Sequence, residues 1–351
     1  MTATPTPRVT AQVDLGAYRR NLSRLIRSVS PSKVMAVVKA DAYGHGLVPI
    51  ARAAVGEGVE WLGALDTQTA LELRSADIDP GTNIFAWHLA PEENCRPVID
   101  ARIDLGISTI AQLEQIAAAG AQRAARLHLK IDTGLHRNGA LRADWPALVR
   151  RARELEQSGV AELYGAWTHI AEASYDEDSA AIALFEDAVA EAEALGARFS
   201  LLHLAASAAG LSRQDSRFGL VRFGAFGYGI SPGDGITAAE LGLEPVLTLV
   251  STTVVDADGS VVVPVGYGDG ISSLADGRVQ LCVEGELVDV ARVESDRMIL
   301  SRAVRADAEV ILFGAGKQGE WTLQQWADAT GTIGEEIVTR LVSAIPREYR
   351  E

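Results

Sequence analysis

Basic and imidazole side chains in this sequence stand at or near the ends of short apolar runs. Lys39 follows the run V-M-A-V-V, and Lys130 follows L-H-L. Each of these residues has an ordinary explanation, because lysines extend from strand ends into solvent and a lone histidine is usually a satisfied core residue. On one shared edge of a sheet, however, they would form a site for acid–base chemistry. The residues concerned are Lys39, Lys130, Arg137, His169, His203 and Arg222.

Two segments rich in small residues could hold a phosphate group. H-L-A-A-S-A-A-G contains Ser207, and R-F-G-A-F-G-Y-G contains Gly224 and Ala225. Backbone N–H groups in loops of this kind bind phosphate. A phosphate pocket beside a lysine is what pyridoxal 5'-phosphate requires, because the lysine amine forms a Schiff base with the cofactor's aldehyde. The sequence therefore predicts this cofactor, with Lys39 as its attachment point.

The elements that must position these residues alternate between strands and helices. Amphipathic stretches separate most of the apolar runs, and this alternation predicts a parallel sheet. Eight such units in about 230 residues are typical of a (β/α)8 barrel, whose chemistry lies at the C-terminal ends of the strands. The expected strands are Val34–Lys39, Trp61–Leu65, Ile84–Trp87, Asp104–Ile107, Leu127–Ile131, Leu163–His169, Leu201–Leu204 and Val221–Phe226.

The pattern changes near residue 233. Apolar stretches such as E-P-V-L-T-L-V-S-T-T-V-V then follow one another with short turns, and helical patterns are almost absent until Leu323. We therefore predict an α/β barrel domain over residues 1–232 that binds the cofactor, followed by a mainly β domain over residues 233–351.

Composition limits the possible partners. The net charge of −15 disfavours nucleic acid and anionic membranes as ligands. The two cysteines, Cys95 and Cys282, indicate neither a disulfide framework nor a metal site. The N-terminus does not resemble a signal peptide, and no apolar segment is long enough to span a bilayer. We expect a cytoplasmic protein with a small-molecule substrate and no metal.

Several motifs together resemble the alanine racemase family of fold-type III pyridoxal-phosphate enzymes. The resemblance implies a barrel followed by a β domain, a head-to-tail homodimer with shared active sites, and interconversion of L- and D-alanine or a related amino acid. The motifs are A-V-V-K-A-D-A-Y-G-H-G, K-I-D-T-G-L-H-R-N-G, W-T-H-I-A, H-L-A-A-S-A, V-R-F-G-A-F-G-Y-G, P-V-G-Y-G-D-G and T-I-G-E-E, in the family's order from residue 36 to residue 336.

The resemblance also implies a role for each candidate residue. Lys39 would hold the cofactor and act as a catalytic base, and His169 would lie beside the ring. Arg137 would face the cofactor's phenolic oxygen and the substrate carboxylate, and Lys130 is the family's position for a carbamylated lysine that orients this arginine. His203 would support Arg222. The phosphate would be held by Tyr43, Ser207, Gly224 and Ala225.

Arg222 also carries a physical argument. A guanidinium keeps its proton at usable pH, so Arg222 can only donate to the pyridine nitrogen. That nitrogen then stays unprotonated, and the cofactor withdraws electrons less strongly. A short-lived carbanion results, which favours reprotonation at Cα and therefore suits racemisation.

The residues expected from the β domain depart from the family pattern. The family's second catalytic base is a tyrosine in a V-S-Y-G loop, but no tyrosine lies between Tyr228 and Tyr267, and the turn Asp256–Ser260 bridges the deletion. Tyr267 would reach across from the other subunit. Glu294, Ser295 and Arg297 replace family residues near the substrate carboxylate, and the Ser295 N–H could still donate there. Glu335 replaces a phosphate-binding tyrosine.

Three functional hypotheses remain open from the sequence. The first is an alanine racemase-like enzyme in which Tyr267, Glu294 or a water replaces the missing tyrosine. The second is a one-base enzyme in which Lys39 alone supports elimination, retro-aldol cleavage or decarboxylation. The third is a cofactor-binding relative without turnover. The extent of the match places the racemase first.

Overall fold

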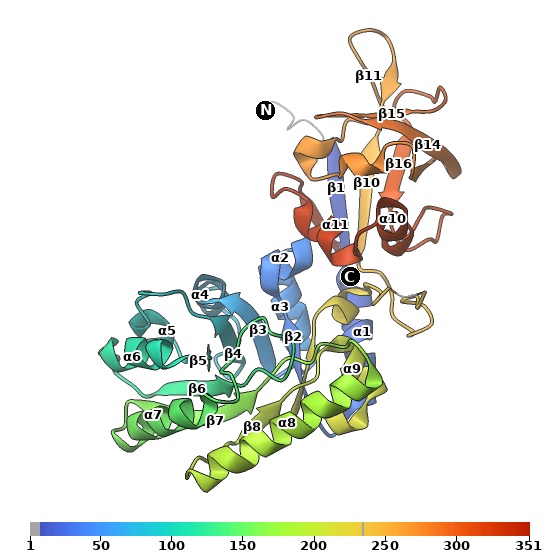
Figure 1. Cartoon of the computed structure of the whole chain (residues 1–351). Helices are drawn as coiled ribbons and strands as arrows, with labels where there is room; N and C mark the ends of the chain where they lie inside the picture. Colours follow the sequence, from blue (N-terminus) through green and yellow to red (C-terminus); the bar gives the residue numbers. More distant parts are fainter. Residues whose placement is uncertain (1–7, 234) are drawn as a thin grey trace. The chain divides into compact units, whose positions relative to one another are not determined.

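A computed structural model describes residues 8–233 and 235–351 of the chain (Figure 1). These residues form two compact units, and each is described by itself. The barrel unit contains residues 23–39 and 54–224. The β unit contains residues 8–22, 40–53 and 225–351.

The barrel unit contains eight parallel strands, as the sequence predicts. They follow the order β8-β7-β6-β5-β4-β3-β2-β9. No ladder joins β8 to β9, but the Gly219 N–H donates to the Leu202 carbonyl at 3.0 Å beside them, so the barrel is nearly closed. The strands are β2 (Lys33–Val37), β3 (Trp61–Asp66), β4 (Asn83–His88), β5 (Ile103–Ile107), β6 (Ala125–Lys130), β7 (Ala161–Trp167), β8 (Leu201–His203) and β9 (Leu220–Phe223).

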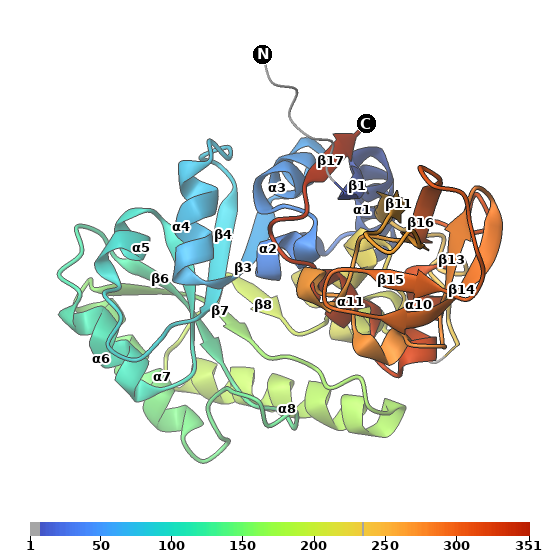
Figure 2. The ribbon, with the colours of Figure 1, turned by 90° about the horizontal axis from the view of Figure 1, so that it is seen from above.

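Helices follow most of these strands and lie around the outside of the sheet, as α5, α6, α7 and α8 show in Figure 2. Polar side chains fix where several of them begin: Asp66 accepts the Thr69 N–H, and Thr109 forms a capping box with Gln112. The helices are α4 (Thr67–Ser75), α5 (Arg96–Asp100), α6 (Ile110–Ala118), α7 (Trp145–Gln157), α8 (Tyr175–Ala194) and α9 (Ser207–Ser212).

Three of the predicted strand ends were wrong by two or three residues. The strand expected to end at Phe226 is β9, which ends at Phe223. Lys39 was expected to end a strand, but β2 ends at Val37 and Lys39 begins the short helix α2 (Lys39–Gly44). His169 lies two residues beyond the end of β7. Both residues therefore stand on the backbone that leaves the strand, where side chains can turn over the barrel mouth.

Large side chains fill the barrel interior, so it is a packed core. The buried cluster consists of Met35, Trp61, Phe85, Trp167, Leu201 and Leu220. Glycine is required where the interior is most crowded. A Cβ at Gly165 of β7 would lie 2.5 Å from Nδ1 of His128 on β6.

The β unit is built on a seven-stranded sheet in the order β15-β14-β13-β16-β10-β1-β17. The sequence analysis did not identify β1, although V-T-A-Q-V-D is a short strand with mostly buried residues. It pairs with β10 in antiparallel fashion and with β17 in parallel. The strands are β1 (Val9–Asp14), β10 (Leu247–Thr252), β13 (Gln280–Val283), β14 (Glu286–Val293), β15 (Met298–Leu300), β16 (Glu309–Phe313) and β17 (Arg347–Arg350).

Short elements complete the β unit. A separate hairpin joins β11 (Val254–Val255) to β12 (Val261–Val262), and the helices α10 (Leu323–Thr330) and α11 (Gly334–Arg340) lie between β16 and β17 in the chain. Two helices near the N-terminus, α1 (Leu15–Val29) and α3 (Leu47–Gly56), carry the chain between the units.

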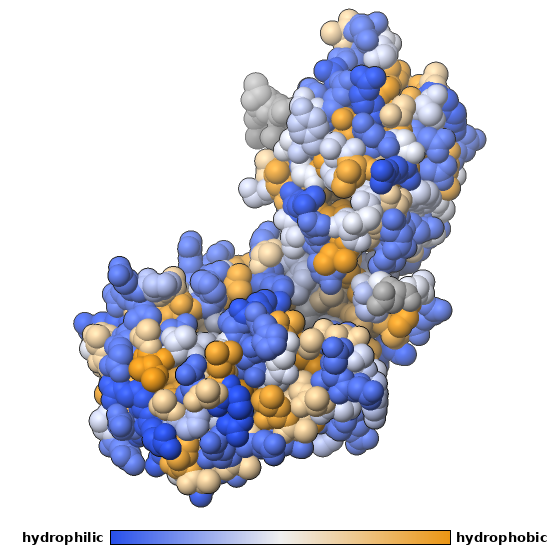
Figure 3. Space-filling view, viewed as in Figure 1, coloured by the Kyte–Doolittle hydropathy of each residue, from blue (hydrophilic) through white to orange (hydrophobic). Residues whose placement is uncertain are grey.

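The visible faces of the units are largely hydrophilic, with apolar side chains scattered among the polar ones (Figure 3). Among the described residues, no helix is both long enough and apolar enough to cross a membrane.

Candidate active site

The C-terminal end of the barrel brings together most of the predicted basic residues. Lys130 ends β6, His203 ends β8, and Arg222 lies in β9. The pKa of His169 is held far below its usual value, first by burial and then by the positive charges of Arg222, Arg137, Lys130 and Lys39. One imidazole therefore senses four cationic groups. The predicted gathering of these residues on one end of the barrel is present in the structure.

Arg222 is the central cation of this cluster. Its Nη2 donates to the Leu204 carbonyl at 2.8 Å and the Thr168 carbonyl at 3.0 Å, and it lies 3.0 Å from Nδ1 of His169. Its Nη1 lies 3.2 Å from Nδ1 of His203. Burial lowers the pKa of Arg222 to about 9, so the guanidinium still carries its proton at neutral pH.

Both histidine contacts require a lone pair on the imidazole, because a guanidinium has no acceptor. His169 and His203 must therefore be neutral on the nitrogen that faces Arg222. Burial, followed by the neighbouring His128 and Arg222, holds the pKa of His203 well below its usual value, in agreement with this assignment.

Lys130 lies in the same cluster and is buried. Its amine donates to Oδ1 of Asn138 and lies 4.4 Å above the centre of the Trp167 ring. Burial, reinforced by Arg222 and Arg137, lowers the pKa of Lys130 to about 7. Arg137 is exposed on the loop beyond β6. Carbamylation of Lys130 stays a prediction.

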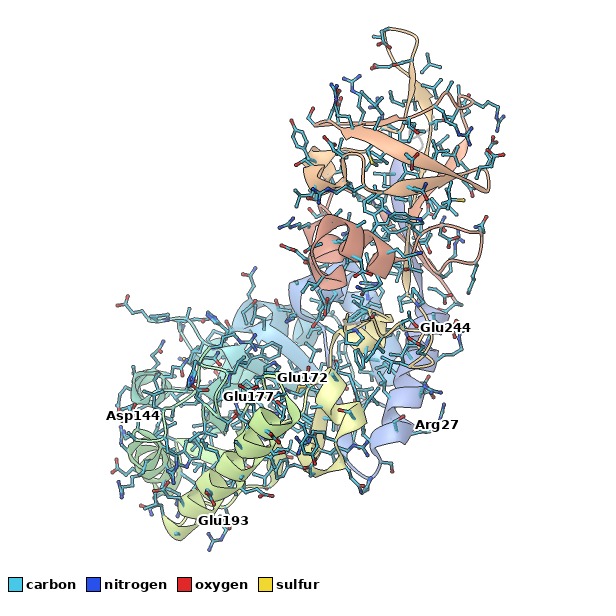
Figure 4. The ribbon with its side chains drawn as sticks, turned by 45° about the vertical axis from the view of Figure 1, so that its right-hand side comes forward. Arg27, Asp144, Glu172, Glu177, Glu193 and Glu244 are labelled. Carbon is cyan, nitrogen blue, oxygen red and sulfur yellow. The ribbon has the colours of Figure 1, made fainter. Side chains whose placement is uncertain are left out.

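The predicted phosphate segments meet at the start of α9. Ser207 is the first residue of that helix, and the Gly224 N–H donates to its Oγ at 3.3 Å. A third participant, Glu172, was not predicted, because an acidic residue in a loop gives no distinctive pattern. Glu172 Oε1 accepts the Ala209 N–H at 2.7 Å, so a carboxylate lies at this helix start. In Figure 4, Glu172 is labelled close to Glu177, at the first turn of α8.

In the β unit, the segment after Lys39 has an unusual backbone. Ala40, Asp41, Ala42 and Tyr43 all have φ between 52° and 54°, in the left-handed region that residues with a Cβ seldom adopt. Each such residue costs about 1–2 kcal/mol, so the surrounding structure must hold the turn in place.

Several side chains hold that turn. Oδ1 of Asp41 accepts the Leu47 N–H at 2.8 Å, and the ring of His45 lies 2.8 Å from the Tyr43 carbonyl through Nδ1. Arg347 donates to the Gly44 carbonyl at 3.0 Å. The strained turn fixes Tyr43, whose pKa is raised by burial and then by the charge of Glu335. The predicted phosphate residue Tyr43 and the substituted residue Glu335 therefore lie near each other.

The altered residues of the β unit form an ion-pair cluster. Arg297 contacts Asp256 in the β11–β12 turn, Glu294 at 3.3 Å and Asp296 at 3.2 Å. The backbone of this cluster supports Tyr267, whose N–H donates to the Glu294 carbonyl at 2.9 Å. The Tyr267 side chain is 56% exposed, and Ser295 is exposed as well. Arg297 therefore holds the shortened hairpin in this structure, and its predicted substrate contact stays a prediction.

Comparison with known proteins decides which family has this arrangement. Residues 13–232 match the alanine racemase N-terminal domain, and residues 251–349 match the alanine racemase C-terminal domain. The chain belongs to the alanine racemase family. It is 39% identical to the alanine racemase of Thermobifida fusca (strain YX) over 367 residues, with 97% of each chain covered, and 40% identical to that of Frankia casuarinae over 97% of this chain and 95% of the relative.

Solved structures of alanine racemases have the same fold. The enzyme from a D-cycloserine-producing Streptomyces lavendulae has a TM-score of 0.92 and 37% sequence identity, covering 99% of this chain and 98% of the other. The enzyme from Streptomyces coelicolor A3(2) has a TM-score of 0.91 and 38% identity, covering 97% and 98%. The predicted barrel and β domain are thus confirmed.

The alanine racemase family depends on pyridoxal 5'-phosphate, and the barrel suits that group. A buried guanidinium, a lysine of low pKa, the half-buried Lys39 and the exposed Arg137 make the barrel end cationic. The indole N–H of Trp167 is buried and has no partner among the described residues. A planar anion would satisfy these groups.

The Thermobifida fusca alignment is also longer than this 351-residue chain, so that alanine racemase has residues that this chain lacks.

Proposed function

We propose that this protein is a pyridoxal-phosphate-dependent alanine racemase that interconverts L- and D-alanine. One observation carries the proposal: a protonated Arg222 is held at the barrel end by the neutral histidines His169 and His203, and Lys39 lies within electrostatic reach of His169. When bound, the cofactor supplies an electron sink for the bond to the α-hydrogen. The curated relatives of similar sequence, named alanine racemases, support the same activity.

In this proposal the barrel residues divide the work by chemistry. Lys39 holds the cofactor covalently and moves the α-proton on one face of the substrate. Arg222 has only donors to offer a ring nitrogen, so it keeps that nitrogen unprotonated and limits the electron sink to what racemisation needs. Lys130 and Arg137 orient the substrate carboxylate. Ser207, Gly224, Ala225 and Tyr43 hold the phosphate through hydroxyl and backbone donors.

The second face of the substrate needs its own base. Tyr267 suits this role best, since its exposed phenol extends from a backbone that Glu294 and Ser295 hold through hydrogen bonds of 2.9 and 2.8 Å. Glu294 is the other candidate, although Arg297 and Arg292 pair with its carboxylate at 3.3 and 3.5 Å. Ser295 would offer its backbone N–H to the substrate carboxylate, with Arg297 beside it.

We also propose a cytoplasmic, head-to-tail homodimer, in which Tyr267 of one subunit serves the barrel of the other. Its support is the exposure of Tyr267 and of the hairpin beside it, where Val255 is 60% exposed. Two buried free cysteines agree with a reducing compartment.

Deuterium exchange tests the proposed activity. The purified protein, reconstituted with pyridoxal 5'-phosphate, is incubated in D2O with L-alanine and, separately, with D-alanine. We expect deuterium at Cα and appearance of the opposite enantiomer from both, and neither from the Lys39→Ala variant. Exchange without inversion, from one enantiomer alone, would overturn the racemase proposal and reveal a one-base enzyme.

A further inference from the structure

A chain of buried polar side chains crosses the barrel interior and ends on Arg222. Nη1 of Arg222 lies 3.2 Å from Nδ1 of His203, and Nε2 of His203 lies 3.0 Å from Nδ1 of His128. Nε2 of His128 lies 3.1 Å from Oδ2 of Asp104. We call Asp104, His128, His203 and Arg222 the buried hydrogen-bond chain. Asp104, His128 and His203 are all 0% exposed.

Donor and acceptor chemistry gives this chain a single direction. Arg222 can only donate, so Nδ1 of His203 must accept and the His203 proton must be on Nε2. That N–H donates to Nδ1 of His128, which places the His128 proton on Nε2 in turn. The last N–H donates to the Asp104 carboxylate. Both imidazoles are therefore neutral, and both carry their proton on the same nitrogen.

The far end of the chain is anchored by charge. Nη1 of Arg126 lies 3.2 Å from Oδ1 of Asp104, and its guanidinium lies 3.8 Å above the centre of the Tyr164 ring. An ionised carboxylate accepts hydrogen bonds and donates none, so Asp104 fixes the polarity of the chain. Hydrogen bonds in such a sequence polarise one another in a low-dielectric interior.

The barrel backbone makes room for this path. His128 stands on β6 and His203 on β8, so their rings must meet across β7. The β7 residue at that point is Gly165, and any Cβ there would lie 2.5 Å from Nδ1 of His128. Phe85 packs against both rings, with centroids 4.8 Å from His128 and 5.4 Å from His203.

We propose that Asp104 and His128 are positioning residues for Arg222. They hold His203 in the form that presents a lone pair to the guanidinium, and so fix which donors of Arg222 face the reaction site. The consequence for the bound cofactor rests on the proposed function, whereas the proton positions do not. A hydrogen bond from one ring nitrogen of a histidine to a carboxylate fixes which nitrogen of that imidazole carries the proton.

The proton positions can be measured directly in the wild-type, full-length protein with its cofactor bound. Selective ¹⁵N labelling of the six histidines, with signals assigned by single substitutions, reports which ring nitrogens carry protons. We expect His128 and His203 to be neutral and protonated on Nε2. A doubly protonated ring, or a proton on Nδ1 of either one, would overturn the proposal.

The Asp104→Asn variant tests the role. The Asp104 carboxylate accepts from His128 through Oδ2 and pairs by charge with Arg126 through Oδ1, whereas an uncharged amide offers one acceptor and one donor, so at least one of these contacts is lost. We expect altered ¹⁵N signals of His128 and His203, a shifted visible absorbance band of the bound cofactor, and kcat lower by about 10- to 100-fold with little change in KM.

The matched control is Asp66→Asn, the same change at a carboxylate that caps α4 by accepting the Thr69 N–H at 2.7 Å. It should leave the histidine signals and the absorbance band unchanged. Unaltered histidine signals in Asp104→Asn would contradict the proposal. If neither the wild type nor any variant shows a cofactor band, the proposed function fails. The histidine signals then still test whether the buried hydrogen-bond chain is present.

Discussion

Among single residues, the cations gathered at the barrel end shift one another's pKa values, although the carboxylates of Glu172 and Asp132 act on them in the opposite direction. Lys130 shows the consequence most clearly, because burial and its cationic neighbours lower its pKa from 10.5 to about 7. Such a perturbed amine beside a predicted cofactor is typical of functional sites. The lowered pKa also makes the stability of the folded protein depend on pH.

Lys130 should make folding stability depend on pH between about 7 and 10.5. In that window the folded protein leaves the amine neutral while the unfolded chain protonates it, so the free energy of unfolding rises with pH. The slope from one proton is at most about 1.4 kcal/mol per pH unit. Below pH 7 both states are charged, and above 10.5 both are neutral, so the slope disappears. Urea unfolding across this range measures it.

The Lys130→Met variant should remove this slope, whereas Lys33→Met should keep it, because Lys33 is exposed and pairs with Glu60. If the free energy of unfolding of the wild type rises no more steeply with pH than that of Lys130→Met, Lys130 is not a titrating amine. A carbamylated Lys130 would give this result. Intact-protein mass spectrometry under native conditions would then identify the added group.

The basic residues of the site could be located from sequence because each lies in or just beyond a recognisable strand. It did not identify Asp104 or Glu172. Asp104 is a lone acid inside a predicted strand, and its meaning depends on His128, which lies on another strand. Glu172 matters only through the start of α9, far along the chain. Long-range pairing of this kind is absent from local patterns.

Among the elements, strand β7 serves the site through Gly165, whose missing side chain leaves room for the His128 ring. The Gly165→Ala variant places a Cβ 2.5 Å from Nδ1 of His128, so the ring must shift. We expect a loss of about 1–3 kcal/mol of stability from overpacking. Chemical denaturation with and without cofactor would measure it.

Gly56→Ala is the appropriate control for that variant, because a Cβ there meets nothing within 4 Å at the end of α3. It should leave stability equal or slightly higher, since alanine favours helix more than glycine. Equal stability of both alanine variants would mean that the barrel adjusts around residue 165. The space for the His128 ring beside β7 would then not be tightly constrained.

The start of α9 gives a second prediction for an element. The Glu172 carboxylate accepts a hydrogen bond from the Ala209 N–H, two residues from Ser207, where the cofactor phosphate is proposed to bind. Replacing Glu172 with Gln removes a like charge, worth about 1 kcal/mol at a separation of 4 Å in water, so cofactor affinity should rise about fivefold. Quenching of tryptophan fluorescence by added cofactor gives the Kd.

Glu177→Gln serves as the comparison, because Glu177 is bonded to Ser174 in the first turn of α8, whereas Glu172 is bonded to α9. Its Kd should equal that of the wild type. Unchanged or weaker binding in Glu172→Gln would show instead that Glu172 orders the loop around the phosphate rather than opposing it.

The elements themselves followed well from sequence where periodicity was strong. All eight barrel strands were predicted, and the helix that begins at Leu323 was expected there. The missed strand, β1, is paired by β10 and β17, which lie more than two hundred residues away. Neither a six-residue stretch nor its position in the chain indicates such partners. The predicted boundary near residue 233 stays a prediction.

At the scale of the whole molecule, the proposed dimer makes each active site depend on two chains. A Lys39→Ala protein and a Tyr267→Phe protein should each be inactive alone. Mixed and reassembled in equal amounts, they should recover about a quarter of the wild-type sites, because half of random dimers are mixed and each mixed dimer holds one intact pair. Racemisation by the mixture is the measurement.

Lys39→Ala reassembled with itself is the control and should stay inactive. Full activity of Tyr267→Phe alone would exclude the phenol as the second base and leave Glu294 as the candidate. Absence of recovery from the mixture, with dimers present by light scattering, would show that each subunit completes its own site.

The most direct test of the central claim is reductive trapping of the cofactor on the protein. The chain has four lysines, Lys33, Lys39, Lys130 and Lys317, so borohydride reduction of the cofactor-loaded protein followed by peptide mapping has few possible outcomes. We expect one labelled peptide, carrying the cofactor on Lys39. Label on any of the other three lysines, or a colourless protein that cannot be loaded, would overturn the cofactor assignment.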